Sequence, residues 1–172
     1  MLVSLPIPIT QHQLREILSY DPESGAFVWL VTRGKARKDA AAGFTRRDRY
    51  IEIGIDGALY FAHRLAWFYV HGRWPIQQID HINGIRGDNR IANLREASNA
   101  QNLQNLRKAS SNSKSGFLGV SLRKSRGKWR AEIVIEGRKK HLGYFDSSEE
   151  AYAAYLAAKV KFHPYQTITG VL

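Results

Sequence analysis

Three polar residues have types and spacing that suit hydrolysis of a phosphodiester: Asp80, the adjacent His81, and Asn102, which lies 22 residues after Asp80. Such a reaction needs a base for the attacking water, and histidine, whose ordinary pKa is about 6.5, can serve near neutral pH. It also needs a hard divalent cation at the phosphate, and Mg²⁺ takes oxygen ligands. We therefore expect His81 to be the general base, with the Asp80 carboxylate and the Asn102 carbonyl as metal ligands.

This cluster leaves alternatives open. Neighbouring side chains of a regular strand point to opposite faces, so Asp80 and His81 reach one phosphate only if the backbone bends, for which the turn-forming residues 83–84 lie close by. Asn105, three residues beyond Asn102 on the same helix face, is the alternative second ligand. The other polar residues of this stretch are interpreted as turn or cap residues: Asn83, Asp88, Asn89 and Asn99.

Two runs of this sequence resemble a known family: HRLAWFYVHG at 63–72 and IDHINGIRGDNRIANLREASNAQNLQN at 79–105. They are similar to the HNH nucleases, in particular to the phage and intron-encoded homing-endonuclease branch, over roughly residues 20–106. The resemblance implies a ββα-metal core, in which a two-stranded hairpin and a helix surround one metal ion. In that core Asp80 is a ligand and His81 is the base.

The same resemblance assigns further residues by position. Asn93, 13 residues after Asp80, is then the residue that braces the motif loop and positions the histidine. Asn102 stands where many members have a last histidine, which favours Mg²⁺ or Mn²⁺ over a tightly bound transition metal. No other small-molecule cofactor is expected. The candidate DNA contacts in this part of the chain are His63, Arg64 and Arg95, and for His63 and Arg64 anchoring of their own helix is an equal alternative.

Hydrophobic periodicity and turn signals predict the elements that must position these residues. Up to residue 106 they are a helix opened by a Thr10 and Gln13 capping box, strands at 27–31 and 50–55 with a hairpin return to 62, an exposed basic loop at 33–47, and helices at 63–71 and 98–106. Further on they are strands at 117–123, 128–135 and 138–145, and a helix opened by a Ser147 and Glu150 capping box.

Positive charge is concentrated in about one fifth of the chain. The whole sequence has 26 Lys and Arg against 15 Asp and Glu, and residues 107–141 hold 11 of those basic residues and 2 of the acidic ones. Such a stretch, mixed with aromatic residues, is typical of a partner rich in phosphate. A cationic face that serves only solubility is the alternative, and it fits a scattered charge better than a concentrated one.

Residues 115–163 resemble the DNA-binding domain of plant APETALA-type and ethylene-response (AP-two/ERF) transcription factors. The matching pieces include GKW at 127–129, AEI at 131–133 and LGYFD at 142–146. The resemblance implies that the sheet, and not a helix, enters the DNA major groove. Alternation along 128–135 puts Lys128 and Arg130 on one face and Trp129 on the other, which favours Trp129 as a core residue. The candidate contacts are Arg123, Lys124, Arg126, Lys128, Arg130, Arg138 and Lys140.

Composition excludes several other classes of protein. There is no cysteine, which removes disulfides, thiolate zinc sites and cysteine nucleophiles. No apolar run approaches the length that spans a bilayer, and the first residues lack the pattern of a signal peptide. We therefore expect a soluble intracellular protein, in the cytoplasm of a bacterial or phage-infected cell, without a membrane partner.

Together these features predict an α+β fold: a small N-terminal antiparallel sheet with a ββα-metal HNH nuclease core, plus a three-stranded antiparallel sheet backed by one helix. The predicted domains are 1–107 (nuclease with N-terminal β extension), 108–116 (linker) and 117–172 (AP-two/ERF-like DNA-binding domain). The predicted function is Mg²⁺-dependent cleavage of duplex DNA by a homing-type endonuclease, acting as a monomer or weak dimer. The alternatives are a non-catalytic sequence-specific DNA-binding regulator and, more weakly, an RNA-binding module.

Overall fold

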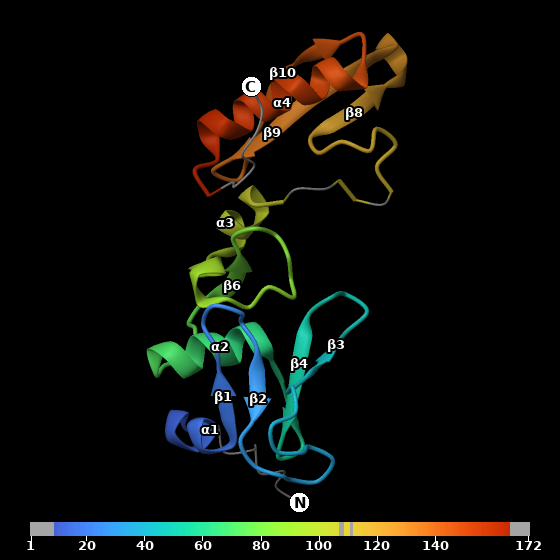
Figure 1. Ribbon diagram of the computed structural model, residues 1–172. Helices are drawn as coiled ribbons and strands as arrows, with labels where there is room; N and C mark the ends of the chain where they lie inside the picture. Colours follow the sequence, from blue (N-terminus) through green and yellow to red (C-terminus); the bar gives the residue numbers. More distant parts are fainter. Residues whose placement is uncertain (1–8, 107–108, 111, 166–172) are drawn as a thin grey trace, which may run out of the picture. The chain divides into compact units, whose positions relative to one another are not determined.

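The computed structural model describes residues 9–106, 109–110 and 112–165. By its internal contacts the chain divides into two compact units, Met1–Glu96 and Ala97–Leu172. Figure 1 shows the helices and strands of both units along the sequence. None of the helices in the described part of the chain has the length and apolar character needed to cross a membrane.

The first unit is built from small antiparallel sheets and two helices. Its elements are α1 (Gln11–Ile17), β1 (Leu18–Tyr20), β2 (Phe27–Trp29), β3 (Phe44–Thr45), β4 (Ile51–Ile55), β5 (Ala58–Phe61), α2 (Ala62–His71), β6 (Gln78–His81), the 3-10 turn η1 (Ile91–Asn93) and β7 (Leu94–Ala97), which ends at the boundary. β1 pairs with β2, the second sheet has the order β3-β4-β5, and β6 pairs with β7. A small antiparallel N-terminal sheet is thus confirmed, in the form of two sheets.

One hydrophobic core holds these elements together. Leu14 of α1, Ile53 of β4 and Leu65 of α2 are fully buried in the same cluster. The predicted capping box is present at α1, where Thr10 and Gln13 satisfy each other's backbone N–H groups. Residues 33–47 differ from the predicted loop only at β3, a two-residue strand too short to leave a periodic pattern.

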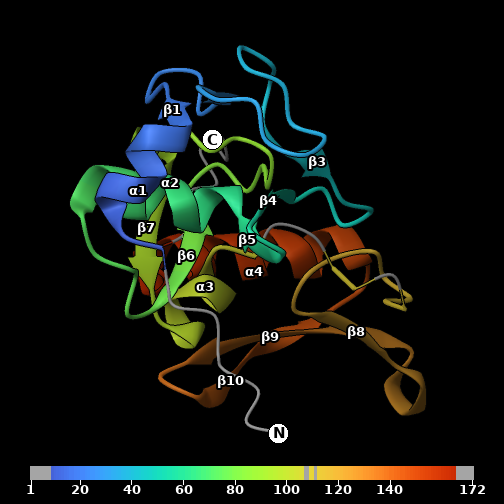
Figure 2. The same ribbon diagram turned by 90° about the horizontal axis from the view of Figure 1, so that it is seen from below.

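The second unit is a three-stranded antiparallel sheet with one helix on its face, as predicted. Its elements are α3 (Asn99–Gln104), β8 (Val120–Arg123), the 3-10 turn η2 (Lys124–Arg126), β9 (Lys128–Ile135), β10 (Arg138–Phe145) and α4 (Ser148–Phe162). Figures 1 and 2 show α4 running along one face of the sheet. Ala131 and Ile133 of β9 are buried under that helix and Trp129 packs beside them, which confirms Trp129 as a core residue.

Gly119 explains how closely α4 approaches the sheet. Its φ is +71°, and a Cβ there would lie 2.2 Å from the Tyr155 ring and 2.6 Å from the Glu132 carbonyl oxygen. The cap of α4 differs in one detail from prediction. Ser147 accepts the Glu150 N–H, but the Glu150 carboxylate accepts the N–H of Asp146 and does not close a reciprocal box.

The helix α3 belongs to the second unit. Leu106, just after α3, accepts a hydrogen bond from Lys159 of α4, a residue only 1% exposed. The Tyr165 N–H donates to the side chain of Gln104, 3.4 Å away. These bonds join the two ends of the second unit.

Candidate active site

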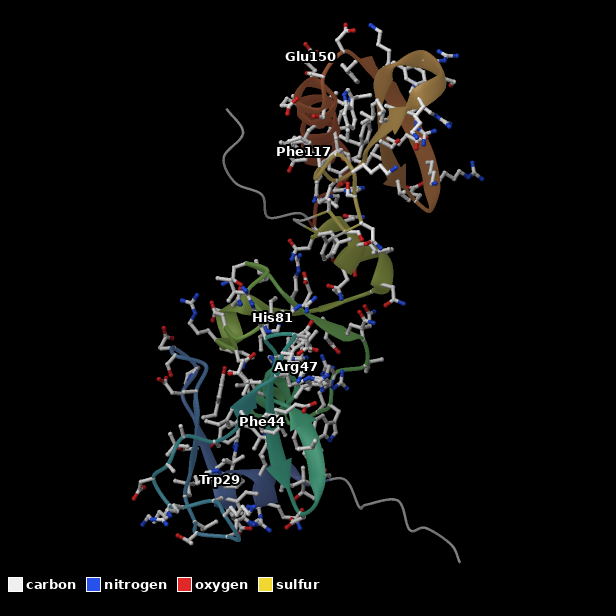
Figure 3. The ribbon with its side chains drawn as sticks, turned by 90° about the vertical axis from the view of Figure 1, so that its right-hand side faces the viewer. Trp29, Phe44, Arg47, His81, Phe117 and Glu150 are labelled. Carbon is white, nitrogen blue, oxygen red and sulfur yellow. The ribbon has the colours of Figure 1, made fainter. Side chains whose placement is uncertain are left out.

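Asp80 and His81 are the last two residues of β6, and both are buried, at 8% and 4% exposure. The backbone turns directly after them: the Gly84 N–H donates to the His81 carbonyl at 2.8 Å, and Gly84 has a φ of +72°. The predicted bend therefore follows the pair and does not divide it. Figure 3 shows His81 among the side chains of the first unit.

The carboxylate of Asp80 is neutralised by an arginine of the neighbouring strand. Nε and Nη2 of Arg95, on β7, both donate to Oδ2 of Asp80, at 3.0 and 2.8 Å. A buried carboxylate requires such a counter-charge. Arg95, which the sequence suggested as a DNA contact, thus has a position in the site itself.

The chemistry of the donor groups fits a hard divalent cation. Asp80 offers carboxylate oxygen, and the described residues contain no group of three or more His, Cys, Asp and Glu side chains of the kind that holds a metal by protein ligands alone. Mg²⁺ is commonly held by one or two protein oxygens, with water and substrate phosphate completing its coordination. The carboxylate oxygen of Asp80 is a donor of the kind that Mg²⁺ and Mn²⁺ accept.

A hydrogen bond and contacts with two aromatic rings hold the imidazole of His81. Nε2 lies 3.1 Å from Oδ1 of Asn89. The rings of His63 and Tyr50 pack with centroids 5.1 and 5.9 Å away. Burial lowers the pKa of His81, against the smaller opposing effect of the Asn89 hydrogen bond. A lowered pKa keeps the imidazole neutral near pH 7, which is the form that accepts a proton from water.

His63 and Arg64 are both engaged within the first unit. His63 is 7% exposed, stacks on Phe61, and has an Nδ1 without a hydrogen-bond partner. Burial lowers its pKa to about 3, with smaller contributions from His81 and Arg64. Arg64 donates to the Pro75 carbonyl at 3.4 Å. These contacts favour the helix-anchoring alternative over a phosphate contact for both residues.

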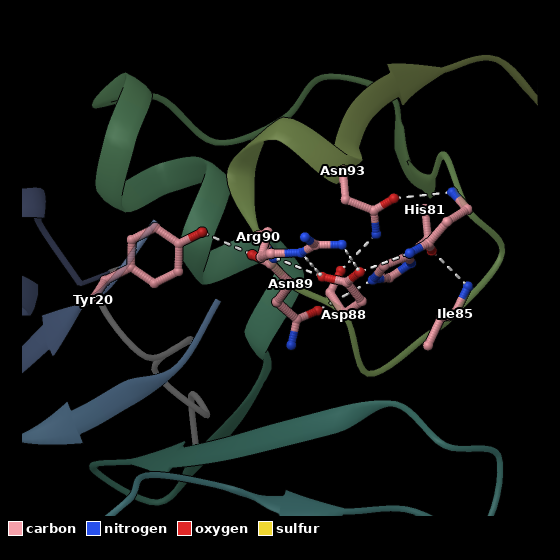
Figure 4. A network of polar contacts seen from close by, with 8 residues as sticks. Tyr20, His81, Ile85, Asp88, Asn89, Arg90 and Asn93 are labelled. Atoms are coloured by element: carbon pink, nitrogen blue, oxygen red, sulfur yellow. Dashed lines mark hydrogen bonds and ion pairs between the residues drawn. The ribbon is translucent and has the colours of Figure 1, made fainter. Parts of the chain in front are cut away.

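Asn93 braces the loop between β6 and β7. Its Oδ1 accepts the N–H of Asn83 at 2.9 Å, and its Nδ2 donates to the Asp88 carbonyl at 2.8 Å (Figure 4). Asp88 in turn accepts from Asn83 and from Arg90, each at 2.6 Å, and the Arg90 bonds lower the pKa of Asp88 to about 2. Asn93 is not the partner of the imidazole in this network: His81 Nε2 lies within hydrogen-bond distance of Asn89, which the sequence analysis interpreted as a turn or cap residue.

The two candidate second ligands lie in the second unit. Asn102 is half-buried on α3, whose start is fixed by a reciprocal capping box between Ser98 and Gln101. Asn105, the C-cap of the same helix, is 6% exposed, and its N–H donates to the Asn102 carbonyl at 3.1 Å. Both residues remain candidates.

Strand register sorts the basic residues of the second unit by face, because directly opposed residues of antiparallel strands share a face. Lys128 pairs with Arg123, and Arg130 pairs with Ser121 and Tyr144, on the face opposite α4. Arg130 forms an ion pair with Glu132 at 2.6 Å, and Lys128 forms one with Asp146. We call this side of β8, β9 and β10 the open face.

Two of the candidate DNA contacts, Arg138 and Lys140, lie at strand positions on the face of the sheet that packs against α4. Lys140 lies opposite buried Ile133, with its ammonium 4.7 Å from the ring centre of Phe162 on α4, and Arg138 lies opposite Ile135. Lys139, opposite exposed Val134, is on the open face instead. The signal for this register was present at residues 136–137, since a two-residue turn fixes which strand positions are opposed.

The part of the chain that contains the candidate site matches a known protein family. Residues 60–104 match the family of HNH endonucleases. Among solved structures, one described as "DNA binding and cleavage by the HNH homing endonuclease I-HmuI" is similar, with 19% identity over 78% of this chain and 75% of that chain and a TM-score of 0.42. No curated protein matches the chain. The match of residues 60–104 to HNH endonucleases supports a DNA-cleaving nuclease.

Proposed function

Because residues 60–104 match the family of HNH endonucleases, we propose that the chain is a homing-type endonuclease that hydrolyses one phosphodiester of duplex DNA with the help of Mg²⁺ or Mn²⁺. The observation that carries this proposal is the buried Asp80-His81 pair at the end of β6. It puts a neutral imidazole next to a carboxylate, at a turn that Asn93 braces.

In this proposal His81 accepts the proton of the attacking water as the water oxygen bonds to phosphorus. The phosphorus–O3′ bond breaks, and the products carry a 5′-phosphate and a 3′-hydroxyl. Asp80 and Asn102 are the residues that would hold the cation, with Asn105 as the alternative to Asn102. When bound, the cation supplies charge stabilisation at the phosphate and at the leaving oxygen. Arg95 orients the buried carboxylate of Asp80 through its two hydrogen bonds to Oδ2.

The second unit is proposed as the main grip on DNA, in the manner of the AP-two/ERF domains that residues 115–163 resemble. Its open face carries Arg123, Lys128, Arg130 and Lys139. Such cations supply an affinity that depends on salt and, at base edges, some sequence readout. The remaining candidates, which the proposal keeps, are Lys124, Arg126, Arg138 and Lys140. Residues 1–107, 108–116 and 117–172 remain the proposed nuclease, linker and DNA-binding domains.

A plasmid assay tests the enzymatic part. Purified full-length protein is incubated with supercoiled plasmid in Mg²⁺, in Mn²⁺, and in each buffer with excess EDTA. We expect relaxed or linear product with either cation and none with EDTA. In a gel shift with EDTA the protein should still bind DNA, since the basic residues of the open face need no metal. Cleavage that persists in EDTA would refute the proposed mechanism.

One contact supports the alternative of a non-catalytic regulator. The Arg95–Asp80 ion pair already neutralises the carboxylate, as a purely structural pair would. A regulator would bind the plasmid in every one of these buffers and cleave it in none. The assay therefore separates the two functions in a single series.

A further inference from the structure

Asn89 has surroundings that a turn residue does not need. It is 1% exposed, in the loop between β6 and η1, and its Oδ1 lies 3.1 Å from Nε2 of His81. Its backbone carbonyl accepts a hydrogen bond of 2.7 Å from the hydroxyl of Tyr20, a residue 69 positions earlier in the chain. Figure 4 shows the three residues in a row, from Tyr20 through Asn89 to His81.

The amide of Asn89 is incompletely satisfied, which makes its burial costly. Its Nδ2 is buried and has no hydrogen-bond partner in the described part of the chain. A buried N–H without a partner destabilises the folded state. A leucine of similar size would fill the same space without that cost, so packing alone does not explain an asparagine here. The contact that distinguishes asparagine from leucine is the one to His81.

That contact selects one tautomer of the imidazole. An amide oxygen only accepts hydrogen bonds, so Nε2 of His81 must carry the hydrogen when it bonds to Oδ1 of Asn89. In the neutral ring the lone pair is then on Nδ1, which becomes the nitrogen that can take a proton from water. The Tyr50 and His63 rings, tilted by 50° and 75° against His81, restrict rotation of the imidazole.

The N-terminal hairpin holds Asn89 in place. Tyr20 of β1 packs against Phe27 of β2, with ring centres 4.8 Å apart, while its hydroxyl reaches the Asn89 carbonyl. Gly25, in the turn between these strands, approaches so closely that a Cβ there would lie 2.4 Å from the backbone nitrogen of Arg90 and 2.5 Å from the carbonyl carbon of Asn89. The hairpin backbone therefore packs directly on residues 89–90.

We propose that Asn89 is a positioning residue that holds His81 in the Nε2–H tautomer, and that Tyr20 and Gly25 of the β1–β2 hairpin hold Asn89. The proposal rests on the proposed function for the role of His81 in cleavage, but its structural part does not depend on cleavage. The N-terminal hairpin is then part of the catalytic apparatus and not only an extension of it.

The tautomer is measured directly by NMR of protein with ¹⁵N-labelled histidine, at about pH 8, above the ordinary histidine range, without DNA or metal. The signals of His81 are assigned with the His81→Gln variant. We expect Nε2–H in the native chain, loss of that preference in Asn89→Leu, and its retention in Asn89→Asp, because a carboxylate still accepts from Nε2. An Nδ1–H tautomer in the native chain, or an unchanged tautomer in Asn89→Leu, would overturn the proposal.

Cleavage kinetics provide the second measurement. With the DNA substrate of the plasmid assay, Asn89→Leu should lower kcat by at least about tenfold with little change in KM, and Asn89→Asp should restore most of it. Tyr20→Phe removes only the hydroxyl and should lower kcat less. This variant still tests the proposal if the Asn89 variants fail to fold. Asn112→Leu, at an exposed asparagine, should match the native chain. If Asn89→Leu lowers kcat at an unchanged KM while His81 keeps its native tautomer, Asn89 does not act by positioning His81.

The two measurements separate the two proposals. If the native chain has the Nε2–H tautomer and does not cleave DNA, the proposed function fails and the structural part of the inference stands. If the chain cleaves DNA while Asn89→Leu leaves both tautomer and kcat unchanged, the proposed function stands and Asn89 has no positioning role.

Discussion

The polar groups around His81 and those on the open face of the second unit are held in opposite ways. Asp80, His81, Asn89 and Asn93 are all buried, and each has a hydrogen bond to another part of the loop or to a neighbouring strand. Arg123 and Lys139 are exposed at the sheet surface. The difference agrees with two kinds of task, since proton transfer needs a fixed direction whereas attraction to phosphate needs only charge near solvent.

Substitution of His81 should divide the two tasks most clearly. In His81→Ala we expect DNA cleavage to fall by about 10²- to 10⁴-fold, because the water loses its base, and DNA affinity to stay within about 1 kcal/mol. Cleavage is measured with supercoiled plasmid and affinity by gel shift in EDTA. His12→Ala, at an exposed histidine of α1, is the matched control. Equal cleavage by His81→Ala would remove His81 as the base.

Lowering the pH should reduce the stability of the buried region around His81 far more than that of the open face, because His63 is buried in this region. Its folded pKa, about 3, lies below the ordinary value of 6.5, so the neutral form is favoured by folding. That stability is complete above pH 6.5 and is lost as the pH falls from 6.5 towards 3. The expected loss from this residue between pH 7 and pH 5 is about 2 kcal/mol.

Urea unfolding at the two pH values measures this loss. The groups that face His63 are His81, Tyr50, Phe61 and Arg64, and of these His81 adds a loss of the same sign. His63→Phe should therefore keep part of the pH dependence while reducing it clearly. An identical pH dependence in His63→Phe and the native chain would show that His63 does not carry it.

Gly25→Ala should damage the buried region from a distance. Its φ is +73°, and the added Cβ would meet the backbone of residues 89–90 at 2.4–2.5 Å. We expect a loss of at least about 2 kcal/mol in urea unfolding, together with reduced cleavage. Gly34→Ala separates the two causes, since Gly34 also has a positive φ, +58°, but no atom lies within 4 Å of the Cβ position. Equal losses of stability in both variants would show that the positive φ, and not the contact with residues 89–90, causes the effect.

Sequence patterns predicted the elements whose signals are local. The Thr10 capping box, the hairpin return after the strand at 50–55 and the strands at 128–135 and 138–145 all depend on residues within a few positions. The Asn93 brace followed from the family resemblance. The contact of Asn89 with His81 could not be predicted in this way, because what buries Asn89 is the β1–β2 hairpin, more than 60 residues away in sequence.

The faces of the second sheet sit between these two cases. Alternation along 128–135 predicted correctly which side of β9 carries Lys128 and Arg130. The residue pattern of β10 alone does not give its register with β9. The basic run RKK at 138–140 of β10 alternates between the two faces. Alternation predicts two sets of residues, and only the pairing with a neighbour tells which set is covered.

Lys139 and Arg138 offer the finest test of that register, with the smallest expected effect. Lys139→Ala removes a charge from the open face, so DNA affinity should fall by about 0.5–1 kcal/mol. The slope of log K against the logarithm of the salt concentration should become less steep by about 0.9. Arg138→Ala, the adjacent residue on the face of α4, should change both quantities less. Gel shifts at a series of salt concentrations in EDTA measure them without cleavage. If Arg138 and Lys140 prove more important than Lys139, the duplex lies along the edge of β10 and not on the open face, and the division between a buried catalytic region and an exposed sheet for binding must be redrawn around that edge.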